Sequence, residues 1–394
     1  MAGAARTGVA IVGLGGAVAT TAVAGVEMMK LGAMGRDGLP FADAEGLVPY
    51  TSMVFAGWDV DGDDLAKAAH GHRVLDPRQI EVVGPALAGI EPWPAVADPE
   101  YCRNARGNNL VAVAALRDRV AHIAEDLRRF RVEQDLDHLV VVNLASTERW
   151  PNLTLPALAT VEGFEKALDV DDAAITPGMV YAYAAITEGC PYINFTPSAA
   201  ADVPALQELA VARGVPVAGK DGKTGQTMMK TVLAPAFRSR ALTVDGWYST
   251  NILGNRDGEI LDDPASLSSK VNTKGSVLDD ILGYKVDDHV VRIDYYRPRG
   301  DEKEAWDNID LVGFLGQKMQ VKVDFMCRDS VLAAPLVLEL VRLVVEAQRR
   351  GEGGAQEQLG YFFKAPVTRD GSRPEHALHV QEKVLREWIG AGAP

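Results

Sequence analysis

Cysteine is scarce in this chain: only three of its 394 residues are cysteines, and none of them forms a CxxC pair. Disulfide scaffolds and zinc ribbons need more cysteines at closer spacing, so both are excluded as the basis of the fold. The same scarcity fits a reducing compartment, and we expect a cytoplasmic protein. Two close histidine pairs, His70 with His72 and His376 with His379, lie in polar stretches that we expect to be exposed and without a metal ion.

Basic residues are in the minority, because 40 Lys and Arg stand against 54 Asp and Glu and give a formal net charge of −14. Binding of nucleic acid needs a basic surface that neutralises phosphates, so we expect no nucleic-acid partner. An anionic small substrate would instead need a local group of cations. Lysines are distributed accordingly, with three in residues 1–200 and eleven in the rest of the chain.

The sequence also lacks a leucine-rich apolar run. Residues 7–26 carry no charge, but they consist mainly of Gly, Ala, Thr and Val and run directly into Glu27 and Lys30. A signal peptide has a more hydrophobic centre, so we expect neither a leader nor a membrane partner. The composition, 47% hydrophobic and 24% charged, is typical of a folded globular protein. At roughly 100 to 200 residues per domain, the chain has room for two or three domains.

Predicted strands and helices alternate through the first half of the chain. The expected strands are residues 9–12, 53–58, 139–143, 192–195 and 215–218, and the expected helices end near residue 30, span 110–130 and 176–188, and begin at 204. This alternation predicts an α/β fold with a doubly wound, Rossmann-type parallel sheet. Residues 289–296 and 319–327 alternate with a period of two, which predicts antiparallel strands of a second, α+β domain. A helix over 330–349 is apolar on nearly all sides, and we expect it to pack against the first domain.

A glycine turn follows the first strand and opens the first helix. Its sequence GLGGAV contains Gly13, Gly15 and Gly16, where backbone N–H groups and the helix dipole favour a pyrophosphate. Val18 replaces the third glycine of GxGxxG, so a plain tight turn remains the alternative. Asp59, at the end of the second strand, is a candidate acceptor for ribose hydroxyls, with a capping carboxylate as the alternative.

A second glycine-rich segment, GKDGKTGQT at 219–227, has the look of a nucleotide-binding P-loop. The P-loop pattern requires glycine at position 217, where this chain has Val217, so ATP hydrolysis is not supported. The segment brings hydroxyls, an amide and free N–H groups to the start of a helix, which would suit a sugar phosphate. A capped helix start with solvated lysines is the alternative.

Lysines recur in loops rich in Gly and Asp. These loops are residues 219–227, 268–276, 299–304 and 362–366. An ammonium group held by a carboxylate such as Asp221 can stabilise an alkoxide or enolate without a metal ion. Ordinary solvated lysines are the alternative.

Taken in order, several long segments resemble the signature blocks of the inositol phosphate synthase family. They are VGLGGAVATT, FAGWDVDGDDLAKA, GKDGKTGQTMMK, NILGNRDGEILDDP, SKVNTKGSVLDD, RPRGDEKEAWDNID, CRDSVLAAPLVLEL and YFFKAPV. The resemblance implies an NAD-binding Rossmann domain over 1–218, a catalytic and tetramerisation domain over 219–328, and a C-terminal segment over 329–394 that packs back on the first domain. It implies an isomerase that closes glucose 6-phosphate into inositol phosphate without net redox change, and a homotetramer.

The resemblance also implies roles for individual residues. The catalytic residues would be Lys270, Lys274, Lys303 and Lys364, with Asp221 orienting the lysines. The substrate-binding residues would be Thr224, Gly225, Gln226, Thr227, Asn255 and Asp257. The cofactor-binding residues would be Gly13, Gly15, Gly16, Ala17, Val18, Asp59, Ser146, Thr147, Thr196, Asp329 and Ser330. No metal site is expected.

Two segments depart from the family pattern. Residues 194–199 read NFTPSA where a block such as NGSPQN is expected, which puts Phe195 in place of glycine, and residues 143–148 read NLASTE. Both follow strands at the edge where a doubly wound sheet binds ligands. They leave open a family variant that closes fructose 6-phosphate into a five-membered cyclitol phosphate for carbocyclic nucleosides. An ordinary NAD-dependent oxidoreductase or a cofactor-binding regulator is less favoured, because neither needs four ammonium groups at one sugar.

Overall fold

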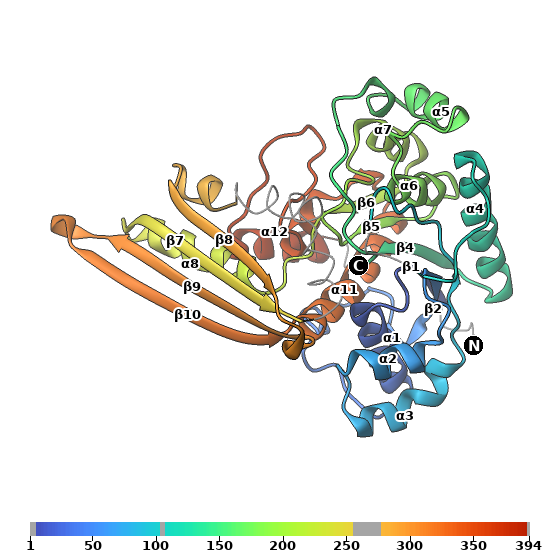
Figure 1. The fold of residues 1–394 in the computed structure, drawn as a ribbon, viewed down its shortest axis with the longest axis horizontal. Helices are drawn as coiled ribbons and strands as arrows, with labels where there is room; N and C mark the ends of the chain where they lie inside the picture. Colours follow the sequence, from blue (N-terminus) through green and yellow to red (C-terminus); the bar gives the residue numbers. More distant parts are fainter. Residues whose placement is uncertain (1–4, 103–106, 255–276, 392–394) are drawn as a thin grey trace.

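Seven parallel strands form the larger of two sheets in the computed structural model, which describes residues 5–102, 107–254 and 277–391 (Figure 1). The strands are β1 (Thr7–Val12), β2 (Met53–Asp59), β3 (Trp93–Pro94), β4 (His138–Asn143), β5 (Tyr192–Asn194), β6 (Pro216–Gly219) and β11 (Gly354–Ala355). Their order across the sheet is β11-β6-β5-β4-β1-β2-β3. The prediction of a Rossmann-type parallel sheet is therefore confirmed, and its five predicted strands are present.

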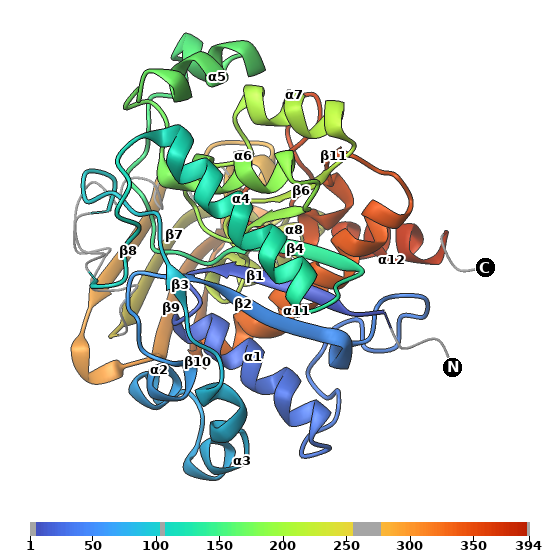
Figure 2. The same ribbon diagram turned by 90° about the vertical axis from the view of Figure 1, so that its right-hand side faces the viewer.

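Helices cover both faces of this sheet (Figure 2). One face carries α1 (Ala17–Lys30), α2 (Leu65–His72), α3 (Pro77–Ala88) and α11 (Asp329–Arg349), and the other carries α4 (Leu116–Glu133), α5 (Val161–Asp169), α6 (Pro177–Thr187) and α7 (Pro204–Arg213). Because strand side chains alternate, Val9 and Ile11 of β1 enter one core while Ala10 and Val12 enter the other. No helix among the described residues is both long and apolar enough to cross a membrane.

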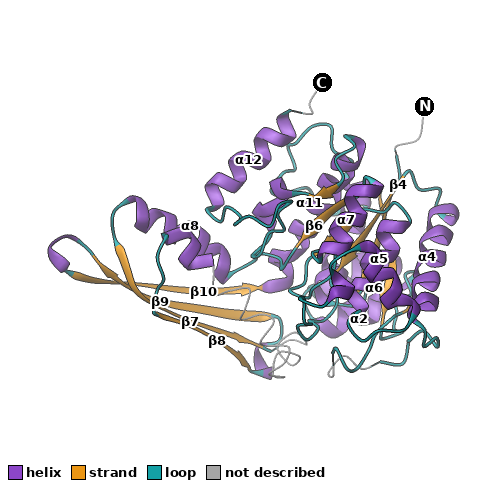
Figure 3. Cartoon of the chain, turned by 90° about the horizontal axis from the view of Figure 1, so that it is seen from above, coloured by secondary structure: helices purple, strands orange, loops and turns teal. Residues whose placement is uncertain are grey.

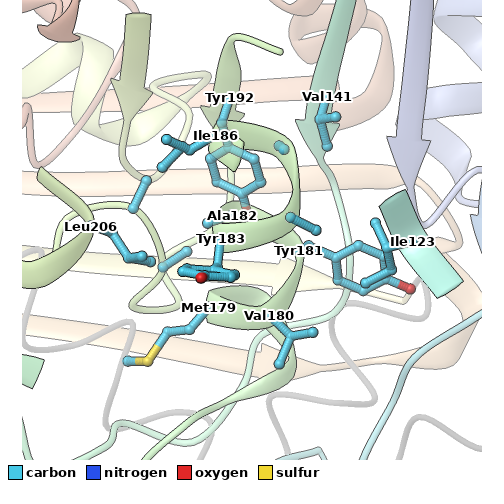
Figure 4. Close-up of a cluster of buried hydrophobic side chains, with 14 of the residues drawn as sticks. Ile123, Val141, Met179, Val180, Tyr181, Ala182, Tyr183, Ile186, Tyr192 and Leu206 are labelled. Carbon is cyan, nitrogen blue, oxygen red and sulfur yellow. The ribbon is translucent and has the colours of Figure 1, made fainter. Parts of the chain in front are cut away.

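The core on the α6 side explains why that helix is buried on nearly every side. Tyr181, Tyr183 and Ile186 of α6 pack in the same cluster as Val141 of β4 and Tyr192 of β5 (Figure 4). The hydroxyl of Tyr181 accepts a hydrogen bond of 2.8 Å from the backbone N–H of Val96, which satisfies its buried polar group. This core therefore fixes the segment after β3 as well as β4 and β5.

The second sheet contains four strands, each of them longer than those of the first, and it projects away from the first sheet (Figure 3). Its strands are β7 (Thr243–Leu253), β8 (Asp288–Tyr295), β9 (Glu302–Val312) and β10 (Lys318–Arg328), in the order β10-β9-β7-β8, and α8 (Gln226–Ser239) covers one face. The prediction that β8 belongs to an antiparallel pair is wrong, because β8 runs parallel to β7. The connection over 254–287 is long enough for the crossover that a parallel pair requires. The antiparallel prediction for β10 is confirmed by its pairing with β9.

The remaining elements complete the C-terminal part and the connections. They include α12 (Leu378–Gly390) and the short 3-10 helices η1 (Tyr50–Ser52), η2 (Pro156–Leu158), η3 (Arg297–Arg299), η4 (Phe314–Gly316) and η5 (Glu357–Phe362). The α4 helix begins at Leu116, later than the predicted start at 110, because residues 109–111 form backbone hydrogen bonds with Ala95 instead.

A buried ion pair on α11 anchors the long loop over 31–50. The side chains of Glu339 and Arg342 are 0% and 4% exposed and lie 2.8 Å apart. Arg342 donates to the carbonyl oxygens of Val48 and Phe41 at 3.0 Å, and Glu339 accepts from the hydroxyl of Tyr50 at 2.6 Å. Backbone carbonyl groups of the loop thus accept hydrogen bonds from α11. These hydrogen bonds also fix the position of the residues just before β2.

We predict that Glu339→Ala lowers the free energy of unfolding by about 3 kcal/mol or more, because it leaves a buried arginine without its carboxylate. Chemical denaturation followed by circular dichroism measures the change. Glu387→Ala is the matched control, since its side chain is 65% exposed in a pair with Lys383, and its cost should stay below about 1 kcal/mol. Equal losses in the two variants would contradict the structural role given to Glu339.

Candidate active site

The carboxyl ends of the parallel strands border a cavity of about 410 Å³. Residues after β1, β2, β4, β5 and β6 line it, together with the first turn of α11 and Lys364. A second cavity of about 120 Å³ lies against Trp58, Val96 and Tyr181. Both cavities share Gly16, Asp59 and residues 144–146 as lining, so they meet at the glycine turn.

The glycine turn is held by the strand beside it. Gly13 has φ of +87°, and its N–H donates to the carbonyl oxygen of Trp58 at 2.8 Å. The N–H of Gly15 donates to Oδ2 of Asp59 at 2.8 Å, and Oδ1 of Asp59 accepts from the N–H of Asp61 at 3.0 Å. Asp59 therefore caps the turn and also lines both cavities, and its role as an acceptor for ribose hydroxyls stays a prediction.

These residues fit a dinucleotide. The N-terminus of α1 has no side-chain cap and no acidic residue in its first turn, so its N–H groups and dipole can take a pyrophosphate. Two cavities that share Gly16 in their lining suit the two halves of a dinucleotide. Asp59, Asp61 and Asp63 line the larger cavity with carboxylates, which favours ribose hydroxyls over a further phosphate.

A short antiparallel ladder joins residues 219–224 to residues 362–367. The N–H of Lys364 donates to the carbonyl oxygen of Asp221 at 2.7 Å, and Gly222 pairs with Phe363. The ladder brings Nζ of Lys364 within 2.7 Å of Oδ1 of Asp221, and these side chains are 10% and 4% exposed. Asp221 adopts φ of +60°, an uncommon value for a residue other than glycine. The predicted partnership of this lysine and this aspartate is therefore a direct, buried ion pair.

Asp329 begins α11 and links two other predicted residues. Its Oδ1 accepts from the hydroxyl of Thr224 at 2.9 Å and lies 3.5 Å from Nζ of Lys303. Lys303 was expected in a loop, but it lies on β9 opposite Cys327, because the strand begins at the preceding residue. Ser330 donates through its hydroxyl to Asp301 at 2.9 Å.

The other predicted site residues fall into three groups: residues that line the cavity, residues at the start of α8, and residues that the structure does not describe. Those on its lining are Gly15, Gly16, Ala17, Val18, Asp59, Ser146, Thr147, Thr196, Asp221, Thr224, Asp329, Ser330 and Lys364. Gly225 precedes α8, and Gln226 and Thr227 form its first turn. The side chain of Gln226 bonds to Asn251 and, at 3.4 Å, to the carbonyl oxygen of Thr250, so it contacts β7. Asn255, Asp257, Lys270 and Lys274 lie outside the described residues.

Sequence reasoning missed the contribution of α2. Its His72 lies 2.7 Å through Nε2 from the carbonyl oxygen of Gly15, and Lys67 also lines the cavity. The helix was not predicted, although Asp64 ahead of an apolar residue is a typical N-cap signal. The expectation that His376 is exposed is also wrong, since it is only 4% exposed.

Lys223 lies within the same segment as Asp221 and Thr224. It is 3% exposed, and its Nζ donates to Oε1 of Gln381 on α12. Burial lowers its pKa to about 7. The loop of the candidate site therefore carries a lysine that titrates near neutral pH.

Comparison with known proteins agrees with this geometry. The sequence profile of the family described as myo-inositol-1-phosphate synthase matches residues 28–389. Inositol-3-phosphate synthase 1 of Bacteroides thetaiotaomicron is 40% identical over 416 aligned positions, which cover 99% of this chain and 97% of that protein. The structure of inositol-3-phosphate synthase from Caenorhabditis elegans gives a TM-score of 0.92 at 28% identity, covering 98% of this chain and 86% of that one. A myo-inositol-1-phosphate synthase-related protein from Thermotoga maritima gives 0.82 at 26% identity, covering 98% of each chain.

We predict that Lys223→Met raises the free energy of unfolding at pH 6 by a few kcal/mol, because a buried ammonium is removed. The pKa is about 7 in the folded chain and about 10.4 in the unfolded one, so the unfolded chain binds more protons between these values. Wild-type stability therefore rises across this window, and its difference from the variant shrinks. Denaturation at pH 6, 8 and 10 measures this, with the 73% exposed Lys166→Met as control. A difference that stays constant with pH would contradict the depressed pKa.

Proposed function

The chain belongs to the myo-inositol-1-phosphate synthase family of NAD-dependent cyclising isomerases, and we propose that it converts glucose 6-phosphate to inositol phosphate. The observation that carries the proposal is the buried pair of Lys364 and Asp221, which borders the same cavity as the glycine turn. This arrangement supports the proposal, because it would set an ammonium group beside the bound dinucleotide. Ring closure through an enolate and an alkoxide needs the ammonium group to stabilise negative charge. It also needs the dinucleotide to oxidise the sugar first and reduce it again afterwards.

We propose that the N-terminus of α1, with Gly16, Ala17 and Val18, holds the pyrophosphate of NAD. Asp59 and the second cavity would receive the adenosine half, and Ser146, Thr147, Thr196 and the first turn of α11 the other half. When bound, NAD would supply a hydride acceptor and donor for the sugar. Oxidation of a sugar alcohol to a ketone makes the hydrogen on the adjacent carbon acidic, and return of the hydride leaves no net redox change.

Thr224 and the first turn of α8 would bind the phosphate of the substrate. The hydroxyl of Thr224 donates to Oδ1 of Asp329 at 2.9 Å and would turn to the phosphate when the substrate binds, and the first N–H groups of α8 have no partner within the helix. A phosphate dianion gains from such donors and from the positive end of the helix dipole. Gln226 would contribute through its backbone, since its side chain contacts β7. Asn255 and Asp257 stay proposed on the resemblance alone.

Lys364 would stabilise the negative charge that develops during ring closure. Its Nζ is held by Asp221, and so a proton donor is oriented before the substrate reacts. Nζ can hold the proton that the alkoxide at C1 takes up after the enolate carbon has attacked the aldehyde. Lys303, positioned by Asp329, would supply a second positive charge. Lys270 and Lys274 complete the proposed set by resemblance.

We also propose a role for each of the three parts of the chain. Residues 1–218 would bind NAD, 219–328 would carry catalysis and assembly, and 329–394 would close the site from the C-terminal side. The face of the second sheet opposite α8 exposes Trp306 and Met326, at 40% and 57%. We propose this face for assembly into a homotetramer.

Lys364→Ala is expected to lower kcat/KM for cyclitol phosphate formation at least about a hundredfold, the usual loss when a group that stabilises transition-state charge is removed. Lys166→Ala, at a lysine that is 73% exposed on α5, should leave turnover unchanged. Bound NAD and the far-ultraviolet circular dichroism of both variants check that the fold persists. If Lys364→Ala turned over near the wild-type level, the lysine would have a structural role only and the proposed catalytic role would be wrong.

The second candidate function is ring closure of fructose 6-phosphate, and Phe195 on the cavity lining is the observation that favours it. Our proposal predicts that glucose 6-phosphate yields a six-membered cyclitol phosphate and that fructose 6-phosphate yields no carbocycle. Nuclear magnetic resonance of the products from isotopically labelled sugars distinguishes the two. A cyclopentane product from fructose 6-phosphate, with no inositol phosphate from glucose 6-phosphate, would favour the second function instead.

A further inference from the structure

Phe195 and Gly222 meet across the loops that follow β5 and β6. A Cβ atom built on Gly222 would lie 2.1 Å from Cε1 and Cζ of the Phe195 ring, far inside a normal contact. The two backbones are also joined, because the N–H of Gly222 donates to the carbonyl oxygen of Phe195 at 2.9 Å. The ring therefore occupies the space that any side chain at position 222 would need.

Gly222 is needed for this space and not for its backbone conformation. Its φ lies outside the left-handed range that favours glycine, whereas Asp221 beside it adopts +60°. The φ of Gly222 is open to alanine, whose methyl group would displace the ring. In this chain the ring of Phe195 fills the space that a side chain at position 222 would need.

The ring forms part of the wall of the larger cavity. Phe195, Thr196 and Pro197 line it from the loop after β5, and Asp221 and Gly222 line it from the loop after β6. The ring is partly exposed, although it also packs against the core on the α11 side. Since Lys364 is paired with Asp221, a change in the ring position alters the space directly beside the proposed ammonium group.

We propose that Phe195 and Gly222 are a size-matched pair that determines which sugar phosphate the cavity accepts. This inference rests on the proposed function, because it assigns the wall to an open-chain hexose phosphate. Phe195 contributes a large side chain from the loop after β5, and Gly222 leaves the matching space free on the loop after β6. The same wall could be built with bulk at 222 and glycine at 195, which makes the pair testable by exchange.

The test uses the NAD-loaded protein and three polyol phosphates as probes. Ribitol 5-phosphate, glucitol 6-phosphate and a heptitol 7-phosphate have five, six and seven carbons and no aldehyde, so they bind without ring closure. Calorimetry gives their affinities for wild type, Phe195→Gly, Gly222→Leu and the double variant. Phe195→Gly should improve the affinity for the seven-carbon probe relative to the six-carbon one by about tenfold, because a ring-sized space opens.

Gly222→Leu should weaken all three probes by about tenfold or more, because the ring is pushed into the cavity. The double variant should return to the wild-type order of affinities, since leucine fills the space from the facing loop. If Gly222→Leu alone does not fold, a double variant that folds with wild-type selectivity still supports the pair. Phe314→Gly is the matched control, because that ring is 88% exposed in η4.

The inference is overturned if Phe195→Gly keeps the wild-type ratio of affinities within about twofold, or if the double variant shows only the summed effects of the single changes. A double variant that stays unfolded, or that behaves like Phe195→Gly, also overturns it. Product analysis of the wild type is a separate readout. Absence of inositol phosphate would refute the proposed function and leave the measured size selectivity standing.

Discussion

The buried ion pair between Asp221 and Lys364 is the interaction on which the candidate site depends. A single charge in such surroundings is costly, and it is tolerated when an opposite charge and hydrogen bonds accompany it. The ladder between residues 219–224 and 362–367 provides that geometry from segments far apart in the sequence. The site is therefore complete only when the C-terminal part of the chain has packed against the first sheet, where β11 pairs with β6.

Asp329 plays a similar part between the two sheets. It starts α11, which packs along the first sheet, and it contacts Thr224 ahead of α8 and Lys303 on β9. One carboxylate thus ties a candidate phosphate ligand to a candidate catalytic lysine. The position of α11 in turn is fixed by the buried Glu339 and Arg342 pair, so the loop after α1 also supports the site from a distance.

Much of this arrangement follows from sequence pattern. The strand and glycine turn at Gly13, and the helix start after Thr224, were predictable because backbone conformation there is encoded locally. The parallel pairing of β7 with β8 was not, because a period of two reports which face of a strand is buried and not the direction of its neighbour. The direct hydrogen bond between Gly15 and Asp59 was likewise not predictable, because the two residues are far apart in the sequence. The contact of the Gln226 side chain with β7 was also not predictable, because it depends on how α8 packs on the second sheet.

The central claim is that ring closure occurs with no net change in the redox state of the nicotinamide. Incubation of the enzyme with glucose 6-phosphate and a small fraction of an equivalent of NAD tests this claim most directly. Cyclitol phosphate is measured by nuclear magnetic resonance, and reduced nicotinamide by its absorbance. We expect many molecules of cyclitol phosphate per molecule of NAD and no accumulation of NADH. Accumulation of NADH in proportion to an oxidised sugar, without a ring product, would contradict it.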